Sequence, residues 1–379
     1  MSNQQNGVFF HAEPPPEAPR LGTGSYSYVV AIPARDEEAL IRPCLEALAA
    51  QQDAPPFAVA LVLNNCSDAT ADVVRKMADQ LPFELHVYDV QLPAHLSDAA
   101  WARRLAMNAA ALLTHAGGVI LTTDADSRVD LRWVRNVMDC YAAGADIVCG
   151  FVAPDFTDAP ALTFEAIRRG AMEYEYSQLT AEANAIIDPD PADPWPNHLV
   201  ETGANLAIGA RDLAALGGVP HVCPGEDQRL VAMARRKGAR IRHAFQPSVT
   251  TSSRVRGRAS GGWGDDLMSR LTDERAQCHP KLEPARAMLR RAAIRARLRT
   301  AFGAASFAQH VARYVSDPEA LAQIAAAPRF SEAWAMLEET SPLLAKHPLL
   351  ARDLEASVVL LRAYLQRRTT RSAQTVESR

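Results

Sequence analysis

The stretch VILTTDAD at residues 119–126 decides the expected fold, because an uncharged, mainly apolar run ends abruptly in two aspartates. An apolar run without polar alternation is typical of a strand that helices bury on both faces. Comparable runs occur at residues 28–32 (YVVAI), 57–63 (FAVALVL) and 85–90 (LHVYDV), with amphipathic stretches between them. This alternation predicts βα units that build a parallel sheet.

The pattern predicts three regions along the chain. Residues 26–264 are expected to form an α/β domain, an open, mostly parallel, twisted sheet flanked by helices. Residues 1–25 are polar and proline-rich, and we expect a flexible tail there. Residues 265–379 are rich in Ala, Leu and Arg with few β-branched runs, which predicts a C-terminal helical appendage.

Composition limits the class of protein. Of 379 residues, 48% are apolar and 22% charged, so a packed core is expected and wholesale disorder is not. Forty Lys and Arg against 44 Asp and Glu give a net charge of −4, which disfavours bulk nucleic-acid binding. Six scattered cysteines form no CxxC pair, and no apolar run reaches the roughly 18–20 residues of a membrane helix. We therefore expect a cytoplasmic chain, with peripheral contact on the inner face of the membrane left open.

Asp124 and Asp126 follow the strand directly, and positions i and i+2 of an extended segment point to the same side. Two carboxylates that face one cleft repel each other unless a cation lies beside them, and a hard divalent ion such as Mn²⁺ or Mg²⁺ suits oxygen ligands. Such an ion would in turn hold a diphosphate. The alternative is one capping aspartate and one solvated aspartate.

Glu226 and Asp227 open a predicted helix about a hundred residues later, behind Pro224 and Gly225. Carboxylates are favoured at helix N-termini, so ordinary capping explains one of the two acids. A carboxylate in a cleft beside an acceptor hydroxyl can instead accept a proton as general base.

Two further segments carry possible binding residues. Gly203 lets a backbone approach a ligand closely, and Asn205 offers both a donor and an acceptor. Arg254 and Arg258 can fork onto phosphate oxygens, while Trp263, in a glycine-rich stretch, can stack on a sugar or base. Residues 254–264 are thus a candidate lid, and a plain solvated loop is the alternative.

In order and spacing, these pieces resemble a family 2 glycosyltransferase of the GT-A fold. The resemblance covers residues 26–264. Its motifs are AIPARDEE at 31–38, NNCSDAT at 64–70, DAD at 124–126, GAN at 203–205 and GED at 225–227.

The resemblance implies roles for individual residues. Asp227 would be the catalytic base with Glu226 beside it, and Asp124 and Asp126 would hold the ribose and the metal-bound diphosphate. Many members carry an acid where Asn65 stands, and an amide there can bond either uracil or guanine. The remaining nucleotide-sugar-binding residues that it implies are Pro33, Arg35, Glu37, Asn65, Arg103 and Arg104, with Gly203, Asn205, Arg254, Arg258 and Trp263 as above.

The implied activity is transfer of a sugar, hexosyltransferase-like, from a nucleotide-diphosphate sugar to an acceptor hydroxyl by metal-assisted single displacement with inversion. The acceptor (a glycan, a lipid or a small molecule) is not identified by the sequence. A nucleotidyltransferase is the enzymatic alternative, although the turn after the first strand lacks its usual glycine-rich, basic character. A non-catalytic protein that binds sugar nucleotides is the third possibility.

Overall fold

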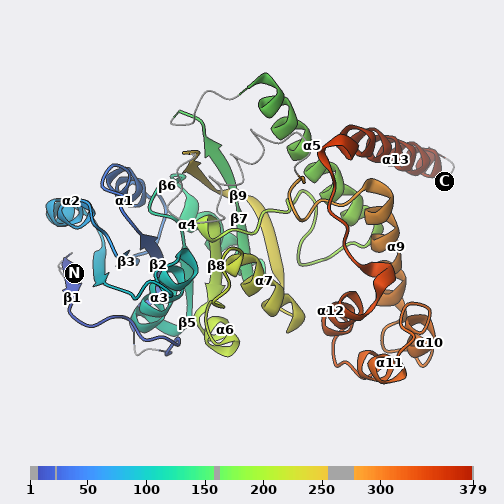
Figure 1. Cartoon of the computed structure of the whole chain (residues 1–379), viewed down its shortest axis with the longest axis horizontal. Coiled ribbons are helices and arrows are strands. Elements are labelled where there is room, and N and C mark those ends of the chain that lie inside the picture. Colours follow the sequence, from blue (N-terminus) through green and yellow to red (C-terminus); the bar gives the residue numbers. More distant parts are fainter. Residues whose placement is uncertain (1–6, 22–23, 158–162, 255–276, 378–379) are drawn as a thin grey trace. The chain divides into compact units, whose positions relative to one another are not determined.

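A computed structural model describes residues 7–21, 24–157, 163–254 and 277–377 of the chain (Figure 1). The chain folds into two compact units. Unit 1 comprises residues 1–160, 200–234 and 239–267, and unit 2 comprises residues 161–199, 235–238 and 268–379. Residues 161–199, which we expected in the α/β domain, therefore group with the C-terminal helices.

Unit 1 contains a nine-stranded sheet in the order β1-β4-β3-β2-β5-β8-β7-β9-β6. The first five strands in this order run parallel, β8 is antiparallel to both of its neighbours, and β7 pairs in parallel with β9. The strands are β1 (Val8–His11), β2 (Tyr26–Ala34), β3 (Ala58–Asn64), β4 (Glu84–Val90), β5 (Thr114–Thr122), β6 (Ser127–Val129), β7 (Ile147–Asp155), β8 (Leu206–Gly209) and β9 (Ile241–Ser252).

Helices cover both faces of this sheet (Figure 1). One face packs against α1 (Ile41–Ala49), α2 (Thr70–Met77) and α4 (Trp133–Ala142). The other packs against α3 (Ala99–Leu113), α6 (Ala210–Leu216) and α7 (Glu226–Arg236). A short 3₁₀ helix, η1 (Ala78–Gln80), follows α2.

The central strands explain why two layers of helices are required. All seven residues of β3 are buried, and they alternate between the two cores: Val59, Leu61 and Leu63 face α1 and α2, while Ala58, Ala60 and Val62 face α3. The fold class predicted from the sequence, an open, mostly parallel sheet flanked by helices with a C-terminal helical region, is confirmed.

Unit 2 is helical. Its helices are α5 (Phe164–Ile187), α9 (Ala285–Ala301), α10 (Phe307–Val311), α11 (Pro318–Ala325), α12 (Phe330–Thr340), η3 (Pro342–Leu344) and α13 (Ala351–Glu377). One core lies among α5, α9 and α13, and a second joins the end of α9 to α10, α11 and α12. None of the described helices combines the length and the apolar character needed to cross a membrane.

One local expectation was wrong. Residues 8–11, placed in a flexible tail, form β1, which pairs with β4. Helix α3 stops at Leu113 and β5 starts at Thr114, ahead of the glycines at 117 and 118. Residues 203–205 form a 3₁₀ helix, η2, capped by Thr202, and the strand β8 begins at Leu206.

Candidate active site

A buried arginine on α3 joins two segments that lie far apart in the sequence. The Nε of Arg103 donates to Glu226 Oε1 at 3.0 Å, and its NH2 group donates to Asp124 Oδ1 at 2.8 Å. Asp124 follows β5 at the carboxyl end of the parallel strands, where open α/β sheets bind ligands. The structure thus brings the first aspartate of the DAD motif and the glutamate of the GED motif to one place.

A glycine makes room for this arginine. A Cβ atom on Gly203 would lie 2.1 Å from the Cζ of Arg103, so any larger residue would displace the guanidinium. The NH1 group of Arg103 donates to Gly203 O at 3.0 Å and to Thr122 Oγ1 at 3.1 Å. We predicted that Gly203 admits a ligand, whereas in the structure it admits a side chain of the protein itself.

Burial alone would lower the pKa of Arg103, but Asp124 and Glu226 outweigh it and the pKa is raised above its ordinary value. The guanidinium is therefore a permanent cation that offsets two carboxylates in a poorly solvated position.

A second arginine binds the other aspartate of the motif. Arg254, at the end of β9, donates from NH1 to Glu37 Oε2 at 2.8 Å and from NH2 to Glu37 Oε1 and to Asp126 Oδ2, the last at 3.0 Å. Thr251 Oγ1 donates to Asp126 Oδ1 at 3.4 Å. Arg254 therefore contacts two other predicted site residues, Glu37 and Asp126.

Negative charge is concentrated at Asp126. Burial, followed by the nearby carboxylates of Asp124 and Glu37, raises the pKa of Asp126 to about 7, although Arg254 acts in the opposite direction. A carboxyl group perturbed in this way marks a place where additional positive charge is favoured.

Asp227 occupies the first turn of α7. Its Oδ2 accepts from the Gly203 N–H at 2.8 Å and its Oδ1 from the Gln228 N–H at 2.7 Å. Burial and the neighbouring Glu226 raise the pKa of Asp227, while Arg103 and the two backbone donors oppose the rise. The result is a positioned carboxylate that is a stronger base than an ordinary aspartate.

The residues predicted to line a nucleotide pocket lie in the loops after β2 and β3. Pro33 is in β2 opposite Val62, and Arg35 donates to Ser97 O at 2.8 Å. Asn65, at φ 51°, donates from Nδ2 to Leu92 O at 2.9 Å and accepts from Leu92 N–H at 3.0 Å. The Asn65 amide therefore fixes the chain after β4.

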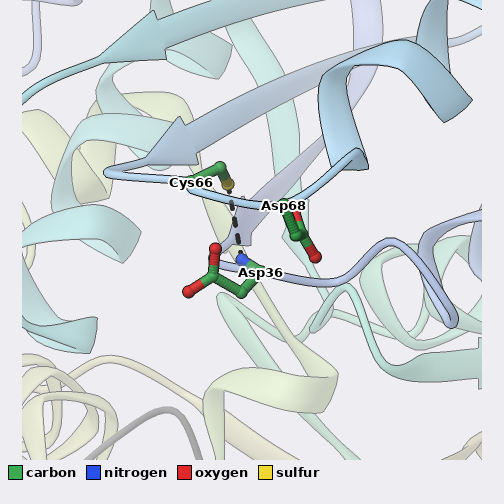
Figure 2. A group of neighbouring side chains, drawn as sticks. All are labelled: Asp36, Cys66 and Asp68. Carbon is green, nitrogen blue, oxygen red and sulfur yellow. Dashed lines mark hydrogen bonds between the residues drawn. The ribbon is translucent and has the colours of Figure 1, made fainter.

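Figure 2 shows a group formed by Asp36, Cys66 and Asp68 in the same two loops, whose possible ligand atoms lie within 4.8 Å of one another. Asp36 N–H donates to Cys66 Sγ at 3.4 Å, and Asp36 Oδ1 accepts from Ser67 N–H at 2.7 Å. Asp68 Oδ2 accepts from Glu38 N–H at 3.0 Å. Burial raises the pKa of Cys66 to about 11, so the thiol stays protonated near neutral pH. These contacts brace the two loops against each other.

Several predicted ligand residues have other partners or fall outside the description. Arg104 donates to backbone carbonyls, to Glu17 O at 2.7 Å, to Gly217 O at 3.0 Å and to Val219 O. Asn205 is buried, and its amide is bonded to other parts of the protein. Arg258 and Trp263, with most of the candidate lid, lie outside the described residues.

Sequence reasoning missed two hydroxyl partners, Thr122 and Thr251, which bond Arg103 and Asp126. The only signal for Thr122 is a polar residue at the end of an apolar run, and Thr251 gives no signal because polar residues and a proline interrupt the apolar pattern of its strand. His243 contacts Glu201, with Nε2 and Oε1 3.2 Å apart and both side chains buried.

Residues 29–177 match the family model described as "Glycosyl transferase family 2". No curated protein sequence matches this chain. Among solved structures, TarS 1-349 from S. aureus in complex with UDP is 15% identical, with a TM-score of 0.43, over 90% of this chain and 92% of that one.

Two other solved structures are similarly distant. The mannosyltransferase PcManGT from Pyrobaculum calidifontis, in complex with GDP-Man and Mn²⁺, is 17% identical, with a TM-score of 0.43, over 96% of this chain and 84% of that one. Glucosyl-3-phosphoglycerate synthase from Mycobacterium tuberculosis, with Mn²⁺, UDP and phosphoglyceric acid, is 14% identical, with a TM-score of 0.39, over 65% of this chain and 77% of that one.

Proposed function

We propose that this chain is a family 2 glycosyltransferase of the GT-A type, which transfers a sugar from a nucleotide-diphosphate sugar to an acceptor hydroxyl with inversion at the anomeric carbon. The catalytic domain is proposed to lie within residues 26–264, apart from residues 161–199 and 235–238, which belong to unit 2, and the C-terminal helical region to lie outside the chemistry. One observation carries the proposal: Asp124, Asp126, Glu226 and Asp227, from two distant motifs, converge at the carboxyl ends of the parallel strands in a chain that matches the family model over residues 29–177.

The donor atoms present fit a divalent cation. Asp124 and Asp126 offer carboxylate oxygens, which hard ions such as Mn²⁺ and Mg²⁺ prefer. Arg103 engages Asp124 through Oδ1, and Oδ2 of Asp124 has no hydrogen bond among the described residues. Asp124 and Asp126 would hold the ion, which when bound neutralises charge on the departing diphosphate.

The remaining chemistry falls to the chain's own side chains. Asp227 accepts the proton of the acceptor hydroxyl, and its raised pKa makes it a better base than an ordinary aspartate. Inversion requires attack opposite the leaving group, so the base must come from a different segment than the residues beside the diphosphate. Helix α7 supplies the base and the end of β5 supplies the cation ligands.

The nucleotide is proposed to lie along the loops after β2 and β3, against Pro33, Arg35 and Glu37. Because the Asn65 amide bonds both Leu92 O and Leu92 N–H, its side chain shapes the turn beside this proposed nucleotide site.

The decisive experiment screens nucleotide sugars with Mn²⁺ for thermal stabilisation and then for sugar transfer or slow donor hydrolysis. Asp227→Asn should keep nucleotide binding and lose transfer by about 10²–10⁴-fold, the usual contribution of a general base. Asp139→Asn, at an exposed residue on α4, is the control and should retain activity. Stabilisation by nucleoside triphosphates over diphosphates would favour a nucleotidyltransferase, and full transfer in excess EDTA would contradict the cation.

A further inference from the structure

The hydrogen bonds of Arg103 account for nearly all of its donors. A guanidinium has five N–H groups. Nε binds Glu226, the two NH1 hydrogens bind Thr122 and Gly203 O, and one NH2 hydrogen binds Asp124. The side chain is 8% exposed. An arginine that clamps phosphate presents two parallel N–H groups to it, and this guanidinium has no such pair left.

We infer that Arg103 is a positioning residue that holds the cation-side carboxylate Asp124 and the base-side pair Glu226 and Asp227 in one geometry, and that it is not a ligand of the donor's diphosphate. This inference rests on the proposed function. It explains how the cation-binding side and the base side of the proposed active site are held together. It also corrects the role that the sequence resemblance implied for this residue.

Arg103 and its two carboxylate partners belong to three different parts of the fold. Arg103 lies on α3, Asp124 follows β5, and Glu226 starts α7. Asp124 is 21 positions and Glu226 is 123 positions from Arg103 in the sequence. A planar fork fixes the directions of both carboxylates, whereas an ammonium is a point charge that sets neither. Arg103 therefore defines where the base stands relative to the cation ligands.

Gly203 extends the connection to Asp227. Its carbonyl accepts from Arg103 at 3.0 Å, and its N–H donates to Asp227 Oδ2 at 2.8 Å. One residue thus transmits the position of the guanidinium to the proposed base. A Cβ at this position would collide with the Cζ and Nε atoms of Arg103, at 2.1 and 2.3 Å, so Gly203→Ala moves the arginine without removing its charge.

Electrostatics gives the arrangement a measurable signature. The charged groups that act on Asp227 are Glu226, which raises its pKa, and Arg103, which lowers it. Removing Arg103 leaves the two adjacent carboxylates without their cation, so Asp227 should lose its proton only at higher pH. A residue that merely stabilised the fold would not move this titration.

The experiment compares Arg103→Gln, Arg103→Lys and Gly203→Ala with a matched control. Arg291 is also a largely buried arginine between two carboxylates, Glu283 and Glu338, but it lies in unit 2. Arg291→Gln therefore reports the general cost of losing a buried ion pair away from the site. Each variant is measured for kcat, donor KM, the affinity of UDP or GDP by calorimetry, and the pH profile of kcat/KM.

The expected result is a fall in kcat of about 10²-fold for both Arg103 variants and for Gly203→Ala, as for other misplaced catalytic groups. Donor KM and nucleotide affinity should change by less than about threefold, because the substitutions misplace the catalytic carboxylates and remove no contact that binds the donor in its ground state. The acid limb of the kcat/KM profile should move to higher pH in Arg103→Gln and stay unchanged in Arg291→Gln.

Two kinetic outcomes would overturn the inference. One is a fall in nucleotide affinity of about tenfold or more in Arg103→Gln that Arg103→Lys restores. This result would make Arg103 a diphosphate ligand. A kcat and pH profile that match those of Arg291→Gln, with only thermal stability reduced, would leave Arg103 a purely structural residue.

A second measurement separates this inference from the proposed function. If the wild-type protein turns over no nucleotide sugar, the proposed function fails. The energetic coupling of Asp124 to Glu226 through Arg103 is then measured from the stability of the folded protein alone. The effects of Asp124→Asn and Glu226→Gln on the urea midpoint should be non-additive in the wild type and additive in Arg103→Gln. Additivity in both backgrounds would show that Arg103 does not couple the two sides.

Discussion

At the residue scale, the acidic group around Asp126 reduces the stability of the folded protein near neutral pH. The ordinary pKa of an aspartate is about 3.9, and burial with Asp124 and Glu37 raises it here to about 7. Because the folded-state pKa is the higher one, protonation stabilises the fold fully below the ordinary value, and this stability is lost as the pH rises through about 7. Functional sites commonly trade stability for chemistry in this way.

Asp126→Asn should therefore raise the melting temperature in EDTA most at pH 8, less at pH 5, and least near pH 3, where the wild-type group carries its proton in both the folded and the unfolded state. The gain should be a few degrees, at about 2–4 °C per kcal/mol for a domain of this size. Asp139→Asn, at an exposed position, controls for general effects of charge removal. A lower melting temperature at pH 8 would mean that Arg254 already compensates Asp126 completely.

Asp227 should set the acid limb of activity. Its pKa is raised by burial and by Glu226, so kcat/KM should rise with pH through a midpoint above the ordinary aspartate value. Glu226→Gln removes the like charge and should shift this midpoint to lower pH, which a profile from pH 4 to 9 measures. A midpoint that does not move, or that moves upward, would remove Glu226 as the cause.

At the scale of elements, Asn205 holds a helix and two strands together. Its Oδ1 accepts from Trp133 Nε1 at 2.8 Å, and its Nδ2 donates to Phe151 O at 2.8 Å and Pro247 O at 2.7 Å, so α4, β7 and β9 meet at one amide. Substitution removes the Asn205 partner from the buried Trp133 N–H and Pro247 carbonyl and from the partly buried Phe151 carbonyl, and each buried group left unsatisfied costs about 1–3 kcal/mol before relaxation.

Asn205→Ala should thus lower the free energy of unfolding by about 2–4 kcal/mol, measured by urea denaturation, because partial relaxation recovers some of that penalty. Asn136→Ala is the control, because the side chain of Asn136, half-buried on α4, makes one hydrogen bond, to Gln246 O at 2.9 Å. Nucleotide affinity of the folded protein should not change. A large loss of affinity with normal stability would restore the ligand-binding role that the sequence predicted.

The elements that sequence patterns located best are those buried on both sides. β2 and β3 appear as continuous apolar runs, and α1 between them carries apolar residues at helical spacing. β1 was missed because VFFH is a short edge strand, held partly by ring contacts such as His11 on Tyr88 at 4.3 Å. β9 gives no continuous apolar run, because polar residues and Pro247 interrupt its pattern.

The candidate site could be found from the order of the motifs, but the hydrogen bonds between its residues could not. Asp124 and Asp126 were named because they follow a buried strand and point to one side of it, and Glu226 and Asp227 because helix capping explains only one of two adjacent acids. The hydrogen-bond partners of Arg103, Gly203 and Asn205 depend on which loops lie next to one another in the folded protein. The spacing of residues along the chain does not predict these contacts between loops. Three residues predicted to touch a ligand therefore touch other residues of the protein.

At the scale of the whole molecule, the described site residues belong to unit 1 alone. They are Glu37, Arg103, Asp124, Asp126, Gly203, Glu226, Asp227 and Arg254. The principal buried charges of unit 2 are paired within that unit, as in Asp188 with Arg295 and Arg299 at 2.5 and 2.8 Å. A nucleotide and a divalent ion should therefore act on unit 1.

Hydrogen exchange with and without UDP or GDP and Mn²⁺ tests this directly. A ligand at 100 times its Kd stabilises the native state by about 2.7 kcal/mol, so exchange that proceeds through unfolding of unit 1 should slow markedly. Protection should be greatest at the carboxyl ends of β2, β3 and β5 and at the start of α7, with α10, α11 and α12 unchanged. The same ligands added to Asp126→Ala should give less protection, because one cation ligand is missing. Protection that appeared in α10–α12 and not at the strand ends would place the nucleotide in unit 2 and separate it from every carboxylate on which the proposed chemistry depends.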